Sequence, residues 1–212
     1  MNKLTSLARI VLCVALVGNL SACVELALGS AVVGSIAATD RRTLGAQTED
    51  KSIGLKGETR IPKLVGEVGH VNVNSYNRRV LLTGEVKDEA TKAQVEREIR
   101  SIEEVREVIN YIDVAGVSSI ASRSSDTLIT TKVKASIIND KNVYANSVKV
   151  VTERGTVYLL GRVTQNEGTQ LAELARSISG VQKVVKVFEE ISEEELKKFI
   201  NQGPNNTRPG QQ

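Results

Sequence analysis

The 212-residue sequence is poor in the side chains that carry most enzymatic and nucleic-acid chemistry. It contains no Trp, two Phe, four Tyr, one His and two Cys. Nucleic-acid binders commonly use stacking platforms or a dense basic surface, which 3% aromatic residues and a net charge of +3 do not provide. The single histidine, His70, is expected in a loop or at a sheet edge, and without partners it builds no nucleophilic or metal site. We therefore predict a protein that is not an enzyme and has no cofactor, metal, small-molecule substrate or nucleic-acid partner.

The N-terminus has the pattern of a bacterial lipoprotein signal. Two basic residues precede an apolar run that is too short to span a bilayer comfortably, and Leu-Ser-Ala-Cys follows at positions 20–23. This box resembles the lipobox of bacterial lipoproteins, so we predict a signal peptide at 1–22 and lipidation of Cys23, with palmitate among the expected acyl chains. The alternative is a small buried cysteine in an unprocessed helix. Cys13 lies in the removed segment, which excludes a disulfide. Val24, which is not acidic, favours an outer-membrane, periplasm-facing location.

The segment after the cysteine is expected to connect the anchor to a folded region. Residues 23–48 are assigned as lipidated anchor and linker, in which 24–39 are rich in Ala and Gly and form a spacer, with helix association through its glycines as the alternative. The polar stretch 40–50 shows no periodicity and is interpreted as linker. A helix over 51–64 is expected to fray or break, because it contains two glycines and a proline.

An internal repeat organises the remaining sequence. Val-Leu-Leu-Thr-Gly-Glu-Val around Gly84 aligns with Val-Tyr-Leu-Leu-Gly-Arg-Val around Gly161. Both glycines lie in expected strands, where a close backbone approach or a bulge would require them. The repeat predicts an α+β fold with domains at 49–115 and 124–191, each a small mixed three-stranded sheet with two helices. The expected elements are strands 71–76 and 79–86, helix 88–102 and strand 105–114, then strands 148–152 and 156–163, helix 167–179 and strand 184–191.

The stretch SDTLITTKVKASII, at 125–138, carries more apolar surface than one core face needs. With Asp126 as N-cap, a helix over 127–138 is predicted. At 100° per residue its core face comprises Ile129, Val133, Ser136 and Ile137. The opposite stripe comprises Leu128, Thr131, Ala135 and Ile138, flanked by Lys132 and Lys134. This stripe is interpreted as a membrane contact in which methyl groups enter lipid and ammonium groups meet phosphates. Packing of the stripe on the other domain is the alternative.

The two repeats differ in charge in a direction that supports this interpretation. Residues 49–115 contain 11 basic and 13 acidic residues, a net charge of 11 − 13 = −2, whereas residues 124–191 contain 9 and 7, a net charge of 9 − 7 = +2. An anionic surface would therefore attract the second repeat more strongly.

These motifs resemble the BON domain, an αββαβ module of bacterial envelope proteins, and the chain from Cys23 to Ile191 is similar to the dual-BON outer-membrane lipoprotein family. The resemblance implies a periplasm-facing lipoprotein that binds anionic phospholipid through the first helix of its second BON domain and supports envelope integrity. Family members often have Trp where this chain has Leu128, so weaker interfacial anchoring is expected. The competing hypothesis is an adaptor that uses the same stripe to bind an envelope assembly or quality-control complex.

The C-terminal region 192–212 is expected to contain a short helix and a disordered tail. Ser192 is followed by Glu at position 195, the spacing of a capping box, and a short amphipathic stripe follows. The tail over 202–212 is nearly devoid of apolar residues.

Overall fold

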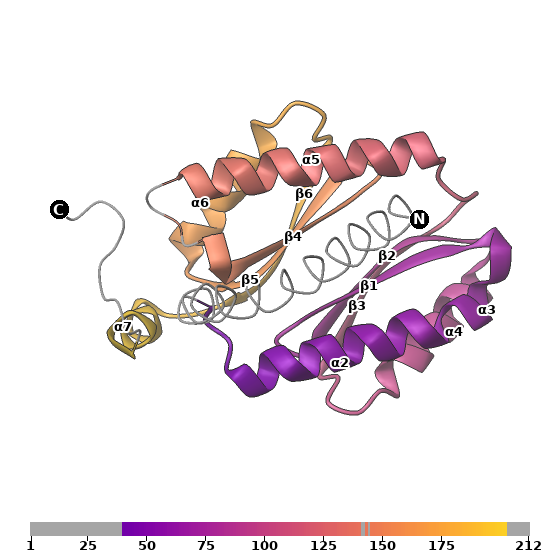
Figure 1. Ribbon diagram of the computed structural model, residues 1–212, viewed down its shortest axis with the longest axis horizontal. Helices are drawn as coiled ribbons and strands as arrows, with labels where there is room; N and C mark the ends of the chain where they lie inside the picture. The colour runs from indigo at the N-terminus through magenta and orange to yellow at the C-terminus, as the bar shows by residue number, and fades with distance from the viewer. Residues whose placement is uncertain (1–39, 141–142, 144, 203–212) are drawn as a thin grey trace, which may run out of the picture. The chain divides into compact units, whose positions relative to one another are not determined.

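The computed structural model describes residues 40–140, 143 and 145–202, in which the repeat forms two domains in tandem (Figure 1). The predicted signal peptide, the predicted lipidation site Cys23, the predicted spacer at 24–39 and the tail from residue 203 lie outside the described residues. The first domain contains α2 (Leu44–Arg60), α3 (Pro62–Val65), η1 (Gly66–Val68), β1 (His70–Tyr76), β2 (Arg79–Val86), α4 (Glu89–Arg100) and β3 (Glu107–Val114). The second contains α5 (Ile120–Asn139), η2 (Ala145–Ser147), β4 (Val148–Glu153), β5 (Thr156–Val163), α6 (Gln165–Arg176) and β6 (Lys183–Glu190), and α7 (Glu193–Gln202) follows.

Each domain has the mixed sheet that the sequence predicted. In the first, β2 is central and pairs antiparallel with β1 and parallel with β3. In the second, β5 is central and pairs in the same way with β4 and β6. The parallel pairs require the crossover helices α4 and α6, whose apolar residues cover one face of each sheet. Buried aliphatic side chains fill the space between sheet and helices in both domains.

The polar segment before the first domain is helical, so the predicted linker over 40–50 is wrong. α2 begins at Leu44, where the Thr43 hydroxyl accepts a hydrogen bond from Ala46 N at 3.1 Å. The domain boundary predicted at residue 49 consequently falls inside this helix. Hydrophobic periodicity could not reveal α2, because small and polar side chains make up most of its buried face: Ala46, Asp50, Ile53 and Gly57.

The glycines of α2 do not interrupt it, contrary to prediction. The helix runs through Gly54 and Gly57 to Arg60. Gly57 is needed for close packing, since a Cβ atom there would lie 2.8 Å from Val73 Cγ1 on β1. The break comes only at Pro62, which takes the first position of α3, where the missing N–H costs nothing.

The glycines in the two central strands permit close backbone approach, as the sequence suggested. Gly84 has φ of +114°, and a Cβ atom there would collide with the carbonyl oxygen of His70. A Cβ atom at Gly161 would lie 2.5 Å from the carbonyl oxygen of Ser147. The approaching backbone therefore belongs to the start of the antiparallel partner strand and the turn before it, where any side chain would push the hairpin apart.

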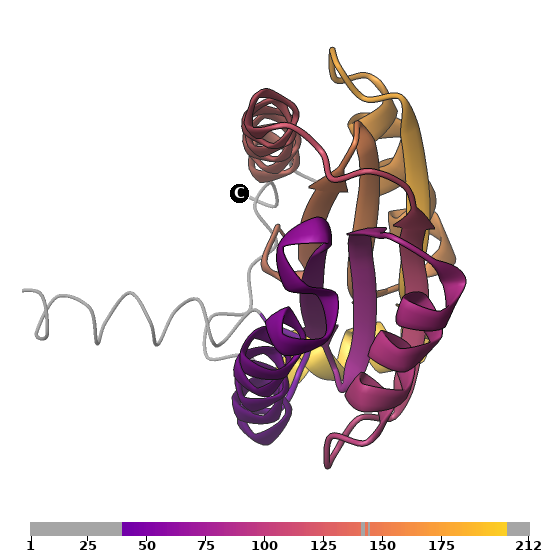
Figure 2. The same ribbon diagram turned by 90° about the vertical axis from the view of Figure 1, so that its right-hand side faces the viewer.

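The two sheets face each other through the surfaces that their own helices leave free. A third buried cluster joins the domains and consists of Tyr76, Leu81, Tyr158, Leu160 and Val187. Tyr111 also contacts Tyr158, with ring centroids 5.1 Å apart. Helices thus lie on the outside of both sheets (Figure 1). α2 contacts β1 and α5 contacts β4, and Figure 2 shows these two helices on the same side of the strands.

The residues just before α2 reach across to the second domain. Arg41 is 4% exposed, and its guanidinium donates to both carboxylate oxygens of Glu167, at 2.7 and 2.6 Å. Arg41 also donates to the carbonyl oxygen of Arg162 at 2.7 Å, and Arg162 returns a hydrogen bond to the Arg41 carbonyl at 3.0 Å. Such bidentate, charge-assisted pairing is strong and directional, so it fixes the start of the first domain on the second.

Candidate functional site: the outer face of α5 and the pocket beside it

The helix predicted to carry the binding stripe is longer than expected. α5 begins at Ile120, and the Ser119 hydroxyl accepts a hydrogen bond from Ser122 N at 3.1 Å. The predicted N-cap, Asp126, lies near the middle of the helix instead. The additional turns bring Ile120 and Arg123 onto the helix, and the sequence analysis had assigned neither residue to the site.

Asp126 closes the β4–β5 turn. It is 6% exposed, and its two oxygens accept hydrogen bonds from the main-chain N–H groups of residues 154 and 155, at 2.9 and 2.8 Å. Asp50 on α2 plays the same part in the first domain, where it accepts from the N–H groups of residues 77 and 78, at 2.7 and 2.8 Å. Each leading helix is thereby fixed to its own hairpin by one buried carboxylate.

The core face of α5 is the one that its periodicity predicted. Ile129, Val133 and Ile137 are buried in the core of the second domain, and Ser136 is half-buried. The opposite side is exposed: its apolar members are Ile120 (83% exposed), Leu128 (63%), Ala135 and Ile138 (68%). Thr131 is also exposed. Leu128 is therefore not buried against the first domain, which was the alternative considered from the sequence.

Of the four charged residues of α5, only Asp126 is buried. Lys132 and Lys134 are exposed, on opposite edges of the apolar stripe. Neither lysine makes a hydrogen bond or ion pair with any residue in the described part of the chain. Asp126 is the helix's one acidic residue, and it is buried. We call the exposed stripe Ile120, Leu128, Thr131, Ala135 and Ile138, with the two flanking lysines, the outer face of α5.

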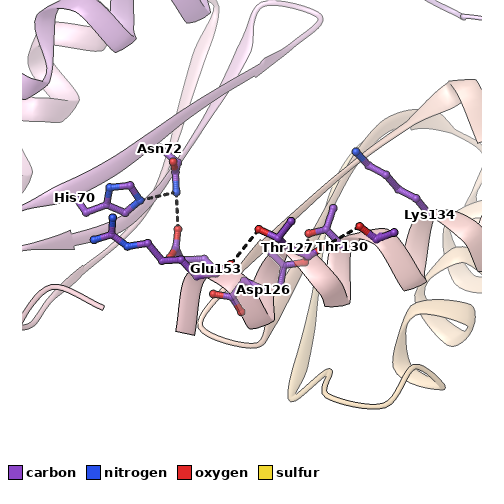
Figure 3. A pocket seen from close by; sticks show the side chains of 10 residues that line it. His70, Asn72, Asp126, Thr127, Thr130, Lys134 and Glu153 are labelled. Carbon is purple, nitrogen blue, oxygen red and sulfur yellow. Dashed lines mark hydrogen bonds between the residues drawn. The ribbon is translucent and has the colours of Figure 1, made fainter. Parts of the chain in front are cut away.

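A pocket of about 370 Å³ lies on the Lys134 side of the same helix (Figure 3). Its walls come from three elements: β1 supplies His70 and Asn72, β4 supplies Thr152 and Glu153, and α5 supplies Arg123, Asp126, Thr127, Thr130, Thr131 and Lys134. The first domain therefore contributes one wall of a cavity that is built mainly on the second. Sequence reasoning had placed His70 in a loop or at a sheet edge, and it begins the edge strand β1.

Hydrogen bonds across the domain junction hold Glu153 in the pocket wall. Its Oε2 atom accepts from Asn72 Nδ2 at 2.8 Å and from Thr83 Oγ1 at 3.3 Å. Burial raises the pKa of Glu153, and the negative charge of Glu85 raises it further. Glu85 is fully buried, and its Oε1 atom lies 3.7 Å from the Arg154 guanidinium. The junction therefore holds two buried acids, of which Glu85 has the half-exposed Arg154 as its ion-pair partner and Glu153 has only neutral hydrogen-bond donors.

His70, which lies beside Asn72 in the same pocket wall, favours its neutral form. Burial lowers the pKa of His70, and the positive charge of Arg123 lowers it further. The ring nitrogen Nε2 lies 3.3 Å from Asn72 Nδ2, which also binds Glu153. Figure 3 shows this row from His70 through Asn72 to Glu153 at one end of the pocket and Lys134 at the other.

None of the helices in the described part of the chain combines the length and the apolar character needed to cross a bilayer.

Comparisons with known proteins agree with the repeat and the fold. The BON domain family model matches twice, at residues 56–116 and 125–191. The chain is 40% identical over 171 residues to the outer membrane lipoprotein DolP of Haemophilus influenzae, covering 80% of this chain and 89% of that protein. It is 31% identical over 151 residues to a 21 kDa hemolysin of Actinobacillus pleuropneumoniae, covering 70% and 78%. It is 29% identical over 117 residues to the osmotically-inducible protein Y of Escherichia coli, covering 54% and 58%.

Proposed function

Because the chain belongs to the dual BON-domain family of outer-membrane lipoproteins, we propose that it is a lipid-anchored protein that faces the periplasm, docks on anionic phospholipid membrane through the outer face of α5, and supports outer-membrane integrity. The observation that carries this proposal is a helix with one side in the core and a second, exposed apolar side bordered by lysines. A helix that only stabilises its own sheet has no use for the second side.

The apolar part of the outer face is large enough to matter for binding. Ile120, Leu128 and Ile138 are 83%, 63% and 68% exposed. Full burial of such a side chain is worth about 1.5 to 3 kcal/mol, so insertion of all three would contribute roughly 3 to 6 kcal/mol. Each lysine near an anionic surface adds about 1 kcal/mol. Together these terms describe reversible docking that supplements an anchor.

The charge balance explains why docking is assigned to α5 and not to α2. α2 also exposes two leucines, Leu44 (70%) and Leu55 (66%). However, α2 contains three basic and three acidic residues, whereas α5 contains three basic residues and one acid that is buried. Anionic headgroups would be repelled by the exposed Glu58 of α2 and would meet no exposed acid on α5.

The anchor is assigned to Cys23, on its lipobox sequence. Two or three acyl chains, at about 0.8 kcal/mol per buried methylene, hold a protein on a membrane essentially permanently. We expect Cys23→Ala to abolish acylation and processing by the lipoprotein pathway. Intact-mass measurement of the protein from membranes tests this, and a native Cys23 that is free and unacylated would exclude the anchor.

Docking is tested by flotation of the unacylated mature chain, made as Cys23→Ser, with vesicles. We expect binding to phosphatidylglycerol vesicles, weaker binding as salt is raised, and little binding to phosphatidylcholine vesicles, because screening weakens the lysine contribution. Equal indifference to both vesicle types would refute membrane docking. The exposed stripe would then be better explained by the competing function, an adaptor for envelope protein partners.

A further inference from the structure

The pocket beside α5 contains two cationic groups, Arg123 and Lys134, that form no ion pair with any described residue; the nearest link to an acid runs from Arg123 through the Ser118 hydroxyl, which donates to Glu85 Oε2 at 3.4 Å. Lys134 Nζ makes no hydrogen bond or ion pair there, and Arg123 uses only Nε, which donates to the Ser118 hydroxyl at 3.2 Å. The terminal N–H groups of Arg123 are left with no such partner. A guanidinium and an ammonium that line one cavity form a natural site for an anion, since both form charge-assisted hydrogen bonds with phosphate.

Three of the four carboxylate oxygens of the pocket's two acids already accept hydrogen bonds from other groups. Both oxygens of Asp126 accept hydrogen bonds from the β4–β5 turn, and Glu153 Oε2 accepts hydrogen bonds from two side chains of the first domain. Among the described residues, neither acid lies within ion-pair distance of Arg123 or Lys134. The cations therefore remain available, although the acids make the pocket a poor site for a bare, highly charged anion.

The threonine hydroxyls on α5 add a second requirement on the ligand. Thr127 donates to the Arg123 carbonyl at 3.0 Å, Thr131 donates to the Thr127 carbonyl at 2.9 Å, and Thr130 donates to the Thr152 hydroxyl at 2.7 Å. Each hydroxyl has one proton, so these three oxygens can only accept further hydrogen bonds. Figure 3 shows Thr127 and Thr130 between Glu153 and Lys134. A ligand that fills the pocket must therefore bring donors as well as negative charge.

We propose that this pocket binds a phosphate ester that carries free hydroxyl groups, with the phosphate at Arg123 and Lys134 and the hydroxyls on the threonine row. A pocket of about 370 Å³ that is open on one side has room for a phosphoglycerol group. Lys134 belongs to both the pocket and the outer face of α5, so a lipid headgroup at the docking surface can supply this chemistry. The inference deepens the proposed function and rests on it for the lipid source; a soluble sugar phosphate is the other source.

The pocket is tested first with a soluble ligand, so that membrane insertion plays no part. Calorimetric titration of the unacylated mature chain with glycerophosphoglycerol should show binding that is tighter than for inorganic phosphate or for glycerol. Thr127→Val removes one acceptor and keeps the side-chain shape, and it should weaken binding about threefold to tenfold, the effect of one hydrogen bond. No binding of glycerophosphoglycerol, or equal affinity for inorganic phosphate, would overturn the proposal.

Two lysine variants on the same helix provide a matched pair. Lys134→Gln and Lys132→Gln each remove one positive charge from the outer face, and both should weaken binding to anionic vesicles. Lys134 lines the pocket and Lys132 does not. Lys134→Gln alone should therefore weaken binding of glycerophosphoglycerol, and an equal loss in both variants would show a general charge effect and contradict a discrete site.

Vesicles then distinguish the two sources of ligand. If the lipid headgroup occupies the pocket, the parent protein should bind phosphatidylglycerol vesicles several-fold better than phosphatidic acid vesicles of equal surface charge, and Thr127→Val should abolish that preference. Tight binding of glucose 1-phosphate without any headgroup preference would support the pocket chemistry and assign a soluble source. Leu128→Glu separates the two proposals, because it should lose vesicle binding and keep glycerophosphoglycerol binding. A protein that binds the soluble ligand but no vesicle refutes only the membrane function.

Discussion

Leu128→Glu is the most direct perturbation of the outer face of α5. Leu128 is 63% exposed, so about two-thirds of the 1.5 to 3 kcal/mol for burying a leucine, or roughly 1 to 2 kcal/mol, is available for membrane insertion. The new carboxylate also faces anionic headgroups, which costs about 1 kcal/mol more. The sum of about 2 to 3 kcal/mol corresponds to roughly 30- to 150-fold weaker vesicle binding. Since the site is exposed, the free energy of unfolding should change by less than about 0.5 kcal/mol.

The assay combines flotation on phosphatidylglycerol vesicles with thermal melts, and two variants serve as controls. Leu55→Glu places the same charge on α2 at a leucine of similar exposure, 66%, and should bind vesicles like the parent. Ile129→Glu places an unpaired carboxylate at a position that is 5% exposed and should unfold the second domain. A Leu128→Glu protein that melts normally and floats like the parent would refute docking through α5. Loss of folding in Leu128→Glu would mean that the faces are wrongly assigned.

Three further predictions concern the framework that positions the site. Gly54→Ala should raise the free energy of unfolding by about 0.5 to 1 kcal/mol, because nothing lies within 4 Å of the new Cβ atom. Gly57→Ala should lower it by about 1 to 3 kcal/mol, because the new Cβ atom would overpack against Val73. Equal shifts in melting temperature for the two variants would contradict the packing argument. Asp126→Ala should cost about 2 to 4 kcal/mol, measured by urea unfolding, because two main-chain N–H groups lose a charged acceptor; a cost below about 1 kcal/mol would show that the carboxylate is not what holds the turn. Glu153→Gln should stabilise the protein more at pH 8 than at pH 5: the pKa of this acid is raised on folding, so its ionised form opposes folding as the pH rises through that value. If Glu153→Gln raised the melting temperature equally at both pH values, ionisation of Glu153 would not be the cause of the lower stability at high pH.

The strands and the two faces of α5 could be predicted, because the apolar residues of each recur along the sequence with the period of a strand or of a helix. The expected strand 79–86 coincides with β2, and the expected strand 156–163 with β5. Alternation of side chains along the sequence indicates a strand whose two faces meet different surroundings. In α5, the helical period places Ile129 and Val133 on one face and Leu128 on the other. These patterns depend on neighbours along the chain, so one sequence suffices to read them.

The starts of the leading helices could not be predicted, because their caps and buried positions carry little apolar signal. α2 buries Asp50 and Gly57, so its inner face resembles a linker. Around the start of α5, serines occupy positions 118, 119, 122, 124 and 125, and each of them can cap a helix. Ser119 is the cap in the structure, and Asp126 is the acceptor for a turn that lies 28 residues further along the chain. A tertiary contact therefore decides which residue caps the helix.

The pocket was beyond reach of the sequence for a related reason. Asn72 and Glu153 are 81 residues apart and meet only because the free faces of the two sheets pack together. Neither residue belongs to a motif, and each would be an ordinary surface residue in a separate domain. The cations Arg123 and Lys134 become a pair only once α5 is extended to Ile120.

The contact between Arg41 and Glu167 determines how mechanical load would pass through the protein. Tension on the chain from the N-terminal side enters the described body at residue 40, and the next residue is gripped by the second domain at 2.6 and 2.7 Å. The pull is therefore transmitted to the domain that carries α5 before it can unwind α2. In a tethered protein, this arrangement would let the domain with the docking helix bear the strain while the first domain stays unloaded.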